Sequence, residues 1–163
     1  MELVLVRVDD RLIHGQVVVG WTRTVKGNRI VVVNDEISTN KMQITLLKMA
    51  TPAGVKSDIL SVGQAVKNLS DGTYGKENVI ILAKEPKTVA ALIEQGIPIK
   101  KVNIGNCRAA EGKTKLLKGV SASPEDIRYW KQLDDQGVVL EAQGFPDQPK
   151  YDFNEIICAQ TIG

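Results

Sequence analysis

The sequence predicts an α/β fold in which a single domain, residues 1–163, is built on an open, mostly parallel β-sheet with helices on both faces. Three observations support this prediction. Short apolar, β-branched runs recur along the chain, and most are followed by a polar turn and then by a segment with helical periodicity. The length suits one buried core rather than two domains. Because parallel strands need long crossovers, the alternation favours helices between parallel strands.

The alternation begins at the amino terminus. The run 3–8 is rich in valine and leucine, as expected of a strand that is buried on both faces. Between residues 17 and 25, apolar side chains recur at intervals of three and four, which predicts a helix that starts near His14 or Gly15. The only histidine of the chain therefore lies at a strand-to-helix junction.

The same pattern continues to residue 142. Further strands are expected at 29–33, 56–62, 78–83, 101–105 and 138–142, and further helices at 42–49, 62–69, 89–93 and 124–136. Ser123 and Pro124 mark the start of the last helix as its N-cap and first helical residue. The segment 106–119 has no clear period and is expected to be a loop with short strand pieces.

Composition and charge narrow the function classes. The hydrophobic fraction of 43%, the charged fraction of 25% and the net charge of +2 are ordinary for a globular protein. Only 4% of the residues are aromatic and the lysines are spread along the chain, which argues against nucleic-acid binding; a phosphorylated partner explains the mild basicity equally well. Since no signal peptide and no apolar run of roughly 18 residues is found, a cytoplasmic location is expected.

Two further features are expected to carry no chemistry. Cys107 and Cys158 have no second Cys or His at metal-ligand spacing, so we expect two reduced, mostly buried thiols and no metal site. Gly112-Lys113-Thr114 resembles the end of a phosphate-binding P-loop, but it lacks the upstream glycine that the pattern needs and is expected to be a solvent-exposed loop.

The strongest chemical signal lies between residues 8 and 17, where two carboxylates, a guanidinium and the histidine follow the first strand. Ligands of parallel sheets bind at the carboxyl ends of the strands, near a switch in topology. Asp35, Lys84 and the Gly105-Asn106 turn each follow a predicted strand and are expected on the same edge. The pattern does not define the strand order, so it does not say which of them lies beside the histidine.

His14 and Arg11 suit phosphoryl transfer. A neutral imidazole is a nucleophile near neutral pH because its reference pKa is about 6.5. Arg11 would bring a planar, permanently charged fork to the phosphoryl oxygens. The N–H groups at the start of the helix, around Gly15 and Gln16, would add further donors to the phosphate.

Asp9 and Asp10 are expected to support this chemistry, and the sequence leaves their roles open. Either could accept a hydrogen bond from the second ring nitrogen of the histidine, or could orient Arg11. Two rival interpretations remain at this point. The acidic pair could bind magnesium in a receiver-like signalling domain that is phosphorylated on aspartate. The stretch could also be a simple polar turn in a non-catalytic ligand-binding domain.

A close resemblance to the active-site segment of one family is carried by Arg7-Val8-Asp9-Asp10-Arg11-Leu12-Ile13-His14-Gly15-Gln16-Val17. The family is the IIB component of the mannose, fructose and sorbose sugar phosphotransferase systems. The likeness extends to residues 32–35, 48–56, 102–105 and 118–121. It implies an open, predominantly parallel sheet with helices on both faces, in agreement with the periodicity.

The resemblance also implies a function. His14 would accept a phosphoryl group on Nδ1 from a phosphohistidine of a IIA protein and donate it to a sugar imported through the membrane subunits IIC and IID, with Arg11 assisting. This chemistry needs no cofactor or metal ion. The donor is expected to be a separate polypeptide, and the protein to be peripherally associated with its transporter. One departure is Gly105-Asn106-Cys107-Arg108, where the family more often has a Gly-Gly-Met-like sequence.

Overall fold

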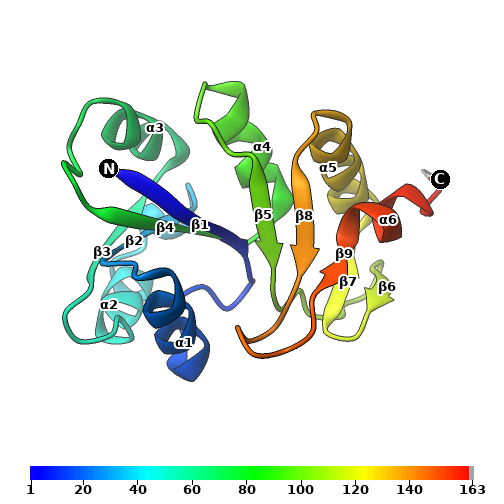
Figure 1. Cartoon of the computed structure of the whole chain (residues 1–163), viewed down its shortest axis with the longest axis horizontal. Helices are drawn as coiled ribbons and strands as arrows, with labels where there is room; N and C mark the ends of the chain where they lie inside the picture. The colour runs from blue at the N-terminus through cyan, green and yellow to red at the C-terminus, as the bar shows by residue number, and fades with distance from the viewer. Residues whose placement is uncertain (162–163) are drawn as a thin grey trace.

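The computed structural model describes residues 1–161, except for the side chains of Gln16 and Val17. Its central sheet has the strand order β3-β2-β4-β1-β5-β8-β9 (Figure 1). The strands are β1 (Glu2–Val8), β2 (Arg29–Val33), β3 (Lys56–Leu60), β4 (Asn78–Ala83), β5 (Lys101–Ile104), β8 (Val139–Ala142) and β9 (Tyr151–Asp152). Neighbouring strands are parallel except for β8 and β9. The predicted fold class is therefore confirmed.

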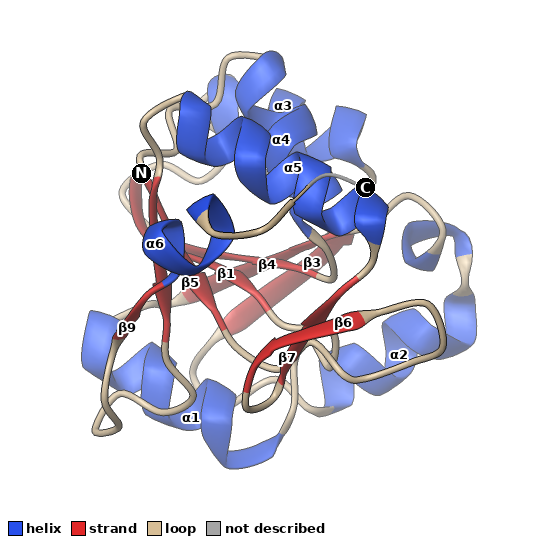
Figure 2. Cartoon of the chain, turned by 90° about the vertical axis from the view of Figure 1, so that its right-hand side faces the viewer, coloured by secondary structure: helices blue, strands red, loops and turns tan. Residues whose placement is uncertain are grey.

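Helices cover both faces of the sheet (Figure 2). One face carries α1 (Gly15–Val25) and α2 (Lys41–Met49), and the other carries α3 (Val62–Ser70), α4 (Pro86–Glu94) and α5 (Pro124–Asp135). Side chains of β2 alternate between the two cores: Ile30 and Val32 pack with residues of α1 and α2, whereas Val31 and Val33 pack on the opposite side. Burial on both faces explains why these strands are continuous apolar runs.

The helix starts follow the capping signals in the sequence. Ser123 accepts a hydrogen bond from the backbone N–H of Asp126 and the Asp126 side chain returns one, which forms a capping box at the start of α5. Ser61 and Gln64 form the same arrangement at α3. The predicted N-cap at Ser123 is confirmed.

Four short elements complete the described part of the chain: η1 (Ile37–Thr39), β6 (Thr114–Leu117), β7 (Val120–Ala122) and α6 (Phe153–Cys158). The antiparallel ribbon of β6 and β7 begins in the segment where strand pieces were expected. Neither β9 nor α6 was predicted from the sequence. Their two and six residues are too few to show a periodic pattern.

Two details differ from expectation. The predicted helix at 42–49, for which the sequence indicates an apolar face of Met42, Leu46, Leu47 and Met49, is present as α2. Met42, Leu46 and Met49 are exposed, however, and Ile44 and Leu47 pack against the core. The expectation of two mostly buried thiols is wrong for Cys158, which is exposed because it ends α6 at the surface; Cys107 is buried.

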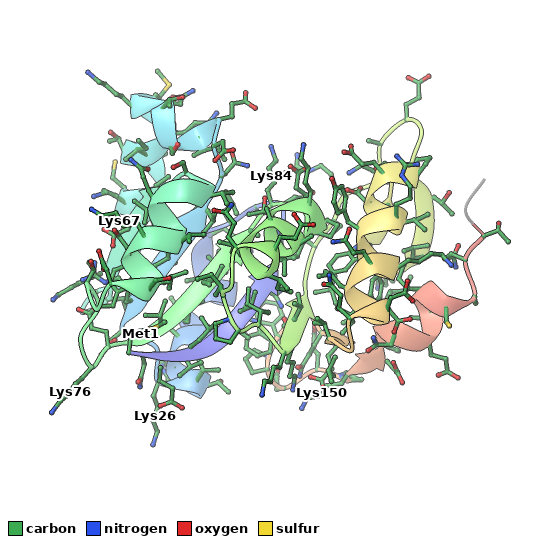
Figure 3. All side chains as sticks on the ribbon, turned by 90° about the horizontal axis from the view of Figure 1, so that it is seen from above. Met1, Lys26, Lys67, Lys76, Lys84 and Lys150 are labelled. Atoms are coloured by element: carbon green, nitrogen blue, oxygen red, sulfur yellow. The ribbon has the colours of Figure 1, made fainter. Side chains whose placement is uncertain are left out.

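The strand order places β1 between β4 and β5. From β1 the chain passes through α1 to β2 on one face, whereas from β5 it reaches β8 through α5 on the other face. The carboxyl ends of β1 and β5 therefore form a topological switch point. Figure 3 shows Lys84, which follows β4 at this edge, on the opposite side of the molecule from Met1, Lys26 and Lys76.

Candidate functional site

The loop after β1 is fixed to the ends of both neighbouring strands. The backbone N–H of Asp9 donates to Ala83 at the end of β4 (3.0 Å), and that of Asp10 donates to Asn106 after β5 (2.8 Å). The N–H of Gly105 donates to Val8 (2.8 Å). The residues that the sequence singled out are therefore held at the switch point by main-chain hydrogen bonds.

Asp9 is the centre of the loop. Its carboxylate is 1% exposed and accepts hydrogen bonds from Nε of Arg11 (3.0 Å) and from Nη2 of Arg11 (3.0 Å). The backbone N–H of Arg11 donates to the same carboxylate (3.1 Å), and so does Nη2 of Arg7 (3.1 Å). This geometry resolves one question that the sequence left open, because Asp9 orients Arg11 rather than the imidazole.

Arg7 is a buried arginine among the valines and leucines of β1. Its guanidinium is 2% exposed and donates to the backbone carbonyls of Gln143 (2.8 Å) and Gly144 (3.0 Å), to the side chain of Asn103, and to Asp9. It also lies 5.2 Å from the centre of the Trp21 ring. Arg7 thus joins the loop after β1 to the loop after β8 and to α1.

The charges in this cluster influence one another. Burial would raise the pKa of the Asp9 carboxyl, but hydrogen bonds from Arg11 and the charge of Arg7 outweigh it and hold that pKa below its usual value. Burial lowers the pKa of the Arg7 guanidinium, whereas the hydrogen bonds to Asp9 raise that of Arg11. The side chain of Arg11 is 37% exposed, so its charge faces solvent while its orientation is set from inside.

Asp10 has a different set of partners. Its carboxylate accepts from Nδ2 of Asn106 (2.9 Å), from the backbone N–H of Arg108 (2.8 Å) and from Nε of Arg108 (3.2 Å). Both partners belong to the loop after β5. Asp10 therefore fastens this loop to the candidate site, and it does not contact the imidazole.

The imidazole of His14 faces inward. Nδ1 lies 2.9 Å from the backbone oxygen of Leu12, and Nε2 is buried and has no hydrogen-bond partner among the described residues. The adjoining cavity measures about 10 Å³, and Trp21 and Val18 are among its lining residues. Because a carbonyl oxygen only accepts, Nδ1 carries a proton in this conformation, and in the neutral imidazole the lone pair is then on Nε2.

The backbone around His14 is unusual. Leu12 has a φ of 58°, in the left-handed region that costs a non-glycine residue about 1–3 kcal/mol, and its buried side chain anchors the turn. His14 is the N-cap of α1, and among the described residues no side chain caps this end of the helix. Gly15, the first helical residue, is exposed and has a φ of 37°. The side chain of Gln16, a predicted phosphate-binding residue, lies outside the described residues.

The other predicted edge residues lie at different distances from the loop. Lys84 and Asp10 line one cavity of about 430 Å³, which fits the position of β4 beside β1. Asp35 instead accepts from the backbone N–H of Val62 (2.8 Å) and serves the start of α3. Of the two, the strand order brings only Lys84 next to the candidate site.

The carboxylates that a magnesium site would need are already bound. Both oxygens of Asp9 accept from guanidinium groups, and both oxygens of Asp10 accept from the loop after β5. Within residues 1–161, no three His, Cys, Asp or Glu side chains are grouped so that they could hold a metal ion. A receiver-like magnesium site would require these ion pairs to break.

Sequence reasoning missed Arg7 and its partners on β5 and after β8. One signal was present, since a lone arginine in a strand that is apolar on both sides needs a buried counter-charge. The partners Asn103, Gln143 and Gly144 lie 96, 136 and 137 residues away in the chain, and no local pattern indicates them. Of the helices in the part of the chain that the structure describes, none has the length and apolarity needed to cross a membrane.

Known proteins are similar to this chain in both sequence and fold. The family model for the sorbose subfamily IIB component of the phosphotransferase system (PTS) matches residues 3–162. The fructose-specific EIIB component of Bacillus subtilis (strain 168) is 36% identical over 157 residues, which are 96% of either chain. The IIBSor domain of the sorbose permease from Klebsiella pneumoniae is similar in structure, with a TM-score of 0.94, 34% identity and 100% of both chains covered.

A longer relative matches over part of its length. The mannose-specific EIIAB component of Escherichia coli (strain K12) is 35% identical over 157 residues, which are 96% of this chain and 49% of that protein. The family match extends over nearly all of the sequence and the structural match over the whole fold. The chain therefore belongs to the sorbose-subfamily IIB components of the sugar phosphotransferase system.

Proposed function

We propose that His14 carries a phosphoryl group from a IIA protein to a sugar that the membrane subunits IIC and IID deliver. As a IIB component the chain has a general role in phosphoryl transfer. The observation that supports His14 as the carrier is its position at the start of α1, three residues after a guanidinium that Asp9 holds in place. Arg11 then stabilises the charge on the phosphoryl oxygens during transfer.

The transfer occurs in two steps. A ring nitrogen of His14 attacks the phosphorus as the P–N bond of the donor phosphohistidine breaks. A hydroxyl oxygen of the sugar then attacks the same phosphorus, the P–N bond to His14 breaks, and the hydroxyl proton is released. Positioning and positive charge supply most of the catalysis in such a reaction, and Arg11 provides both.

The imidazole must turn before it can react. Its Nδ1 is protonated and bound to Leu12, and its Nε2 opens only onto a cavity of about 10 Å³, which is too small for a phosphoryl group. We therefore expect rotation out of this cavity, with transfer of the ring proton to Nε2, so that the lone pair of Nδ1 meets the donor. The observed conformation is a resting state of the carrier.

The partners follow from the family. The Escherichia coli relative is an EIIAB component of which this chain matches about half, which supports a IIA domain as the immediate phosphoryl donor. The sugar and the membrane subunits complete the pathway of the phosphoryl group, and the protein works as a peripheral component of that transporter. The chemistry proposed for His14 uses no metal ion or cofactor.

Radioactive phosphoryl transfer from purified phospho-IIA tests the proposal. The chain holds one histidine, so a phosphohistidine, which is acid-labile and alkali-stable, can lie only on His14. We expect such a label on the wild-type protein and none on His14→Gln, with circular dichroism confirming that the variant is folded. An alkali-labile, magnesium-dependent label that persists in His14→Gln would overturn the proposal in favour of an aspartyl phosphate.

A further inference from the structure

A third cavity opens beside the loop after β1. It measures about 530 Å³, and we call it the Arg11 groove after the first of its main lining residues, which are Arg11, Asn106, Lys118, Gln148 and Tyr151. The groove lies outside the carboxyl ends of β5 and β8, where the ribbon of β6 and β7 meets the loop after β8 (Figure 1). Arg11 and Asn106 bring one side of the groove to the switch point between β1 and β5, where open α/β sheets bind their ligands.

The charge of the groove suits an anion. Arg11 uses Nε and Nη2 to bind Asp9, and among the described residues Nη1 has no hydrogen-bond partner, so part of the fork is available to a ligand. Lys118, in the turn between β6 and β7, adds a second cation. None of the described residues that line the groove is acidic.

The neighbouring cavity at the same edge provides a contrast. It measures about 430 Å³, and Asp10, Glu85, Glu125 and Asp126 line it together with basic residues. A dianionic ligand would meet repulsion from several carboxylates there, whereas in the Arg11 groove it meets two cations. Of these two cavities, the Arg11 groove is the one that fits a phosphoryl group.

The remaining lining suits a polar ring next to that phosphoryl group. A volume of about 530 Å³ falls in the usual range of small-molecule sites, and is far larger than a phosphate ion needs. Gln148 offers an amide, and Tyr151, which is 52% exposed, offers an aromatic face and a hydroxyl group. Amide, hydroxyl and aromatic groups are complementary to the hydroxyl groups and the C–H faces of a sugar.

We propose that the Arg11 groove binds the phosphorylated sugar, with its phosphoryl group between Arg11 and Lys118 and its ring toward Gln148 and Tyr151. The inference rests on the proposed function, because Arg11 would hold the phosphoryl group on His14 and again on the product. The groove therefore makes this protein a part of the sugar site, in addition to carrying phosphate to it.

Isothermal titration calorimetry with the unphosphorylated protein tests the proposal. The probes are fructose 1-phosphate, fructose 6-phosphate and mannose 6-phosphate, each compared with the free hexose and with inorganic phosphate. We expect at least one hexose phosphate to bind more tightly than inorganic phosphate, and the free hexoses to bind most weakly. Lys118→Gln and Tyr151→Ala should each weaken that binding by roughly fivefold.

Lys150→Gln is the matched control. Lys150 is exposed, and it lines a different cavity, which also includes Leu3 of β1. It should bind the hexose phosphate as the wild type does. Equal affinity for inorganic phosphate and hexose phosphates, or no loss in Lys118→Gln and Tyr151→Ala, would overturn the proposal. The proposal would also be overturned if no probe bound at concentrations up to about 10 mM. The groove would then be assigned to a protein partner.

This measurement can fail independently of the proposed function. Binding of a hexose phosphate requires no donor and no phosphohistidine, whereas labelling by phospho-IIA requires no sugar. A protein that is labelled on His14 but binds no hexose phosphate would retain the proposed function and lose the groove. A protein that binds a hexose phosphate but is not labelled on His14 would retain the groove and lose the proposed function.

Discussion

Two arginine clusters lie at opposite edges of the same sheet, and their ion pairs are arranged in opposite ways. At the carboxyl edge, one carboxylate, Asp9, is shared by Arg7 and Arg11. At the amino edge, one guanidinium, Arg29, is shared by Asp58 (3.2 Å) and Glu77 (2.7 Å). One arginine of each cluster also lies over an aromatic ring. Arg7 lies 5.2 Å from the centre of the Trp21 ring, and Arg29 lies 5.1 Å from the centre of the Tyr74 ring.

The difference is in the balance of charge. The cluster around Asp9 has two cations and one anion, and one cation, Arg11, is partly open to solvent. In the cluster around Arg29, Lys56 adds a second cation opposite Glu77 (3.3 Å), so cations and anions are equal in number. The first cluster has one positive charge in excess, which suits the phosphoryl group of the proposed function, whereas in the second cluster the charges balance.

Asp9→Asn should have the largest effect. It removes the only carboxylate between Arg7 and Arg11 within this cluster and leaves a buried guanidinium without its counter-charge, which costs about 3–5 kcal/mol. Phosphoryl transfer should fall by roughly two orders of magnitude because Arg11 loses its orientation. Urea denaturation and transfer from phospho-IIA measure the two losses. Asp10→Asn is the comparison, because Asp10 pairs with Arg108, whose side chain is 70% exposed, and an equal loss in that variant would contradict the special role of Asp9.

Gly105→Ala should have the next largest effect. A Cβ at this position would collide with the Arg7 guanidinium and the Asp9 carboxylate, so the ion pair would have to shift at a cost of about 1–3 kcal/mol. Gly63→Ala is the matched control, because a Cβ there meets no atom within 4 Å and lies in α3, where alanine favours the helix by up to about 1 kcal/mol. If both variants have the same unfolding midpoint and transfer rate, the close packing at Gly105 has no energetic importance.

The pair Arg7→Lys and Arg29→Lys separates the two clusters by function. Lysine keeps the charge but lacks the planar fork, so either variant should lose about 1–2 kcal/mol of stability. Only Arg7→Lys should also slow phosphoryl transfer, by about tenfold, since Arg7 positions Asp9 and through it Arg11. Both variants are assayed at one temperature, below both of their unfolding midpoints. If phosphoryl transfer is also slower in Arg29→Lys than in the wild type, the two clusters do not differ in function.

The pH dependence of stability should show the smallest effect. The pKa of Asp9 is lower in the folded protein than in the unfolded chain, so its ion pairs stabilise the fold above about pH 4 and that contribution is lost as the pH falls through the folded pKa. The stability difference between wild type and Asp9→Asn should therefore be full at pH 7 and shrink below pH 4. Denaturation curves from pH 2 to pH 7 measure it, and a difference that stays constant over this range would contradict the lowered pKa.

Most of the fold is predictable from the sequence for a physical reason. Strands that are buried on both faces must be continuous apolar runs, and the long crossovers between them must be helices, so the alternation is visible in residues 3–142. Strand order is not visible, because β4 and β5 are both apolar and either could neighbour any other strand. The two-residue β9 and the exposed side of α2 were also beyond the pattern.

The site divides in the same way. His14, Arg11, Asp9 and Asp10 are next to one another in sequence, and the structure places them together after β1. The conformation of the backbone turn determines which of the two aspartates contacts Arg11. The sequence does not show this conformation, so Asp9 and Asp10 could not be distinguished from it. The role of Arg7 depends on carbonyl groups more than 130 residues away. Local chemistry was therefore predictable, and the support that fixes it was not.

Trp21 gives the protein an optical reporter of its own reaction. The indole donates to Gly144 (3.0 Å), lies against Arg7 and lines the cavity that holds the imidazole. The other tryptophan, Trp130, is buried against Phe153 in the opposite core. In Trp130→Phe the emission would come from Trp21 alone, and its wavelength would change when the ring of His14 departs and water approaches the indole. The turning of the carrier could then be timed by stopped flow, without a radioactive label or an attached dye.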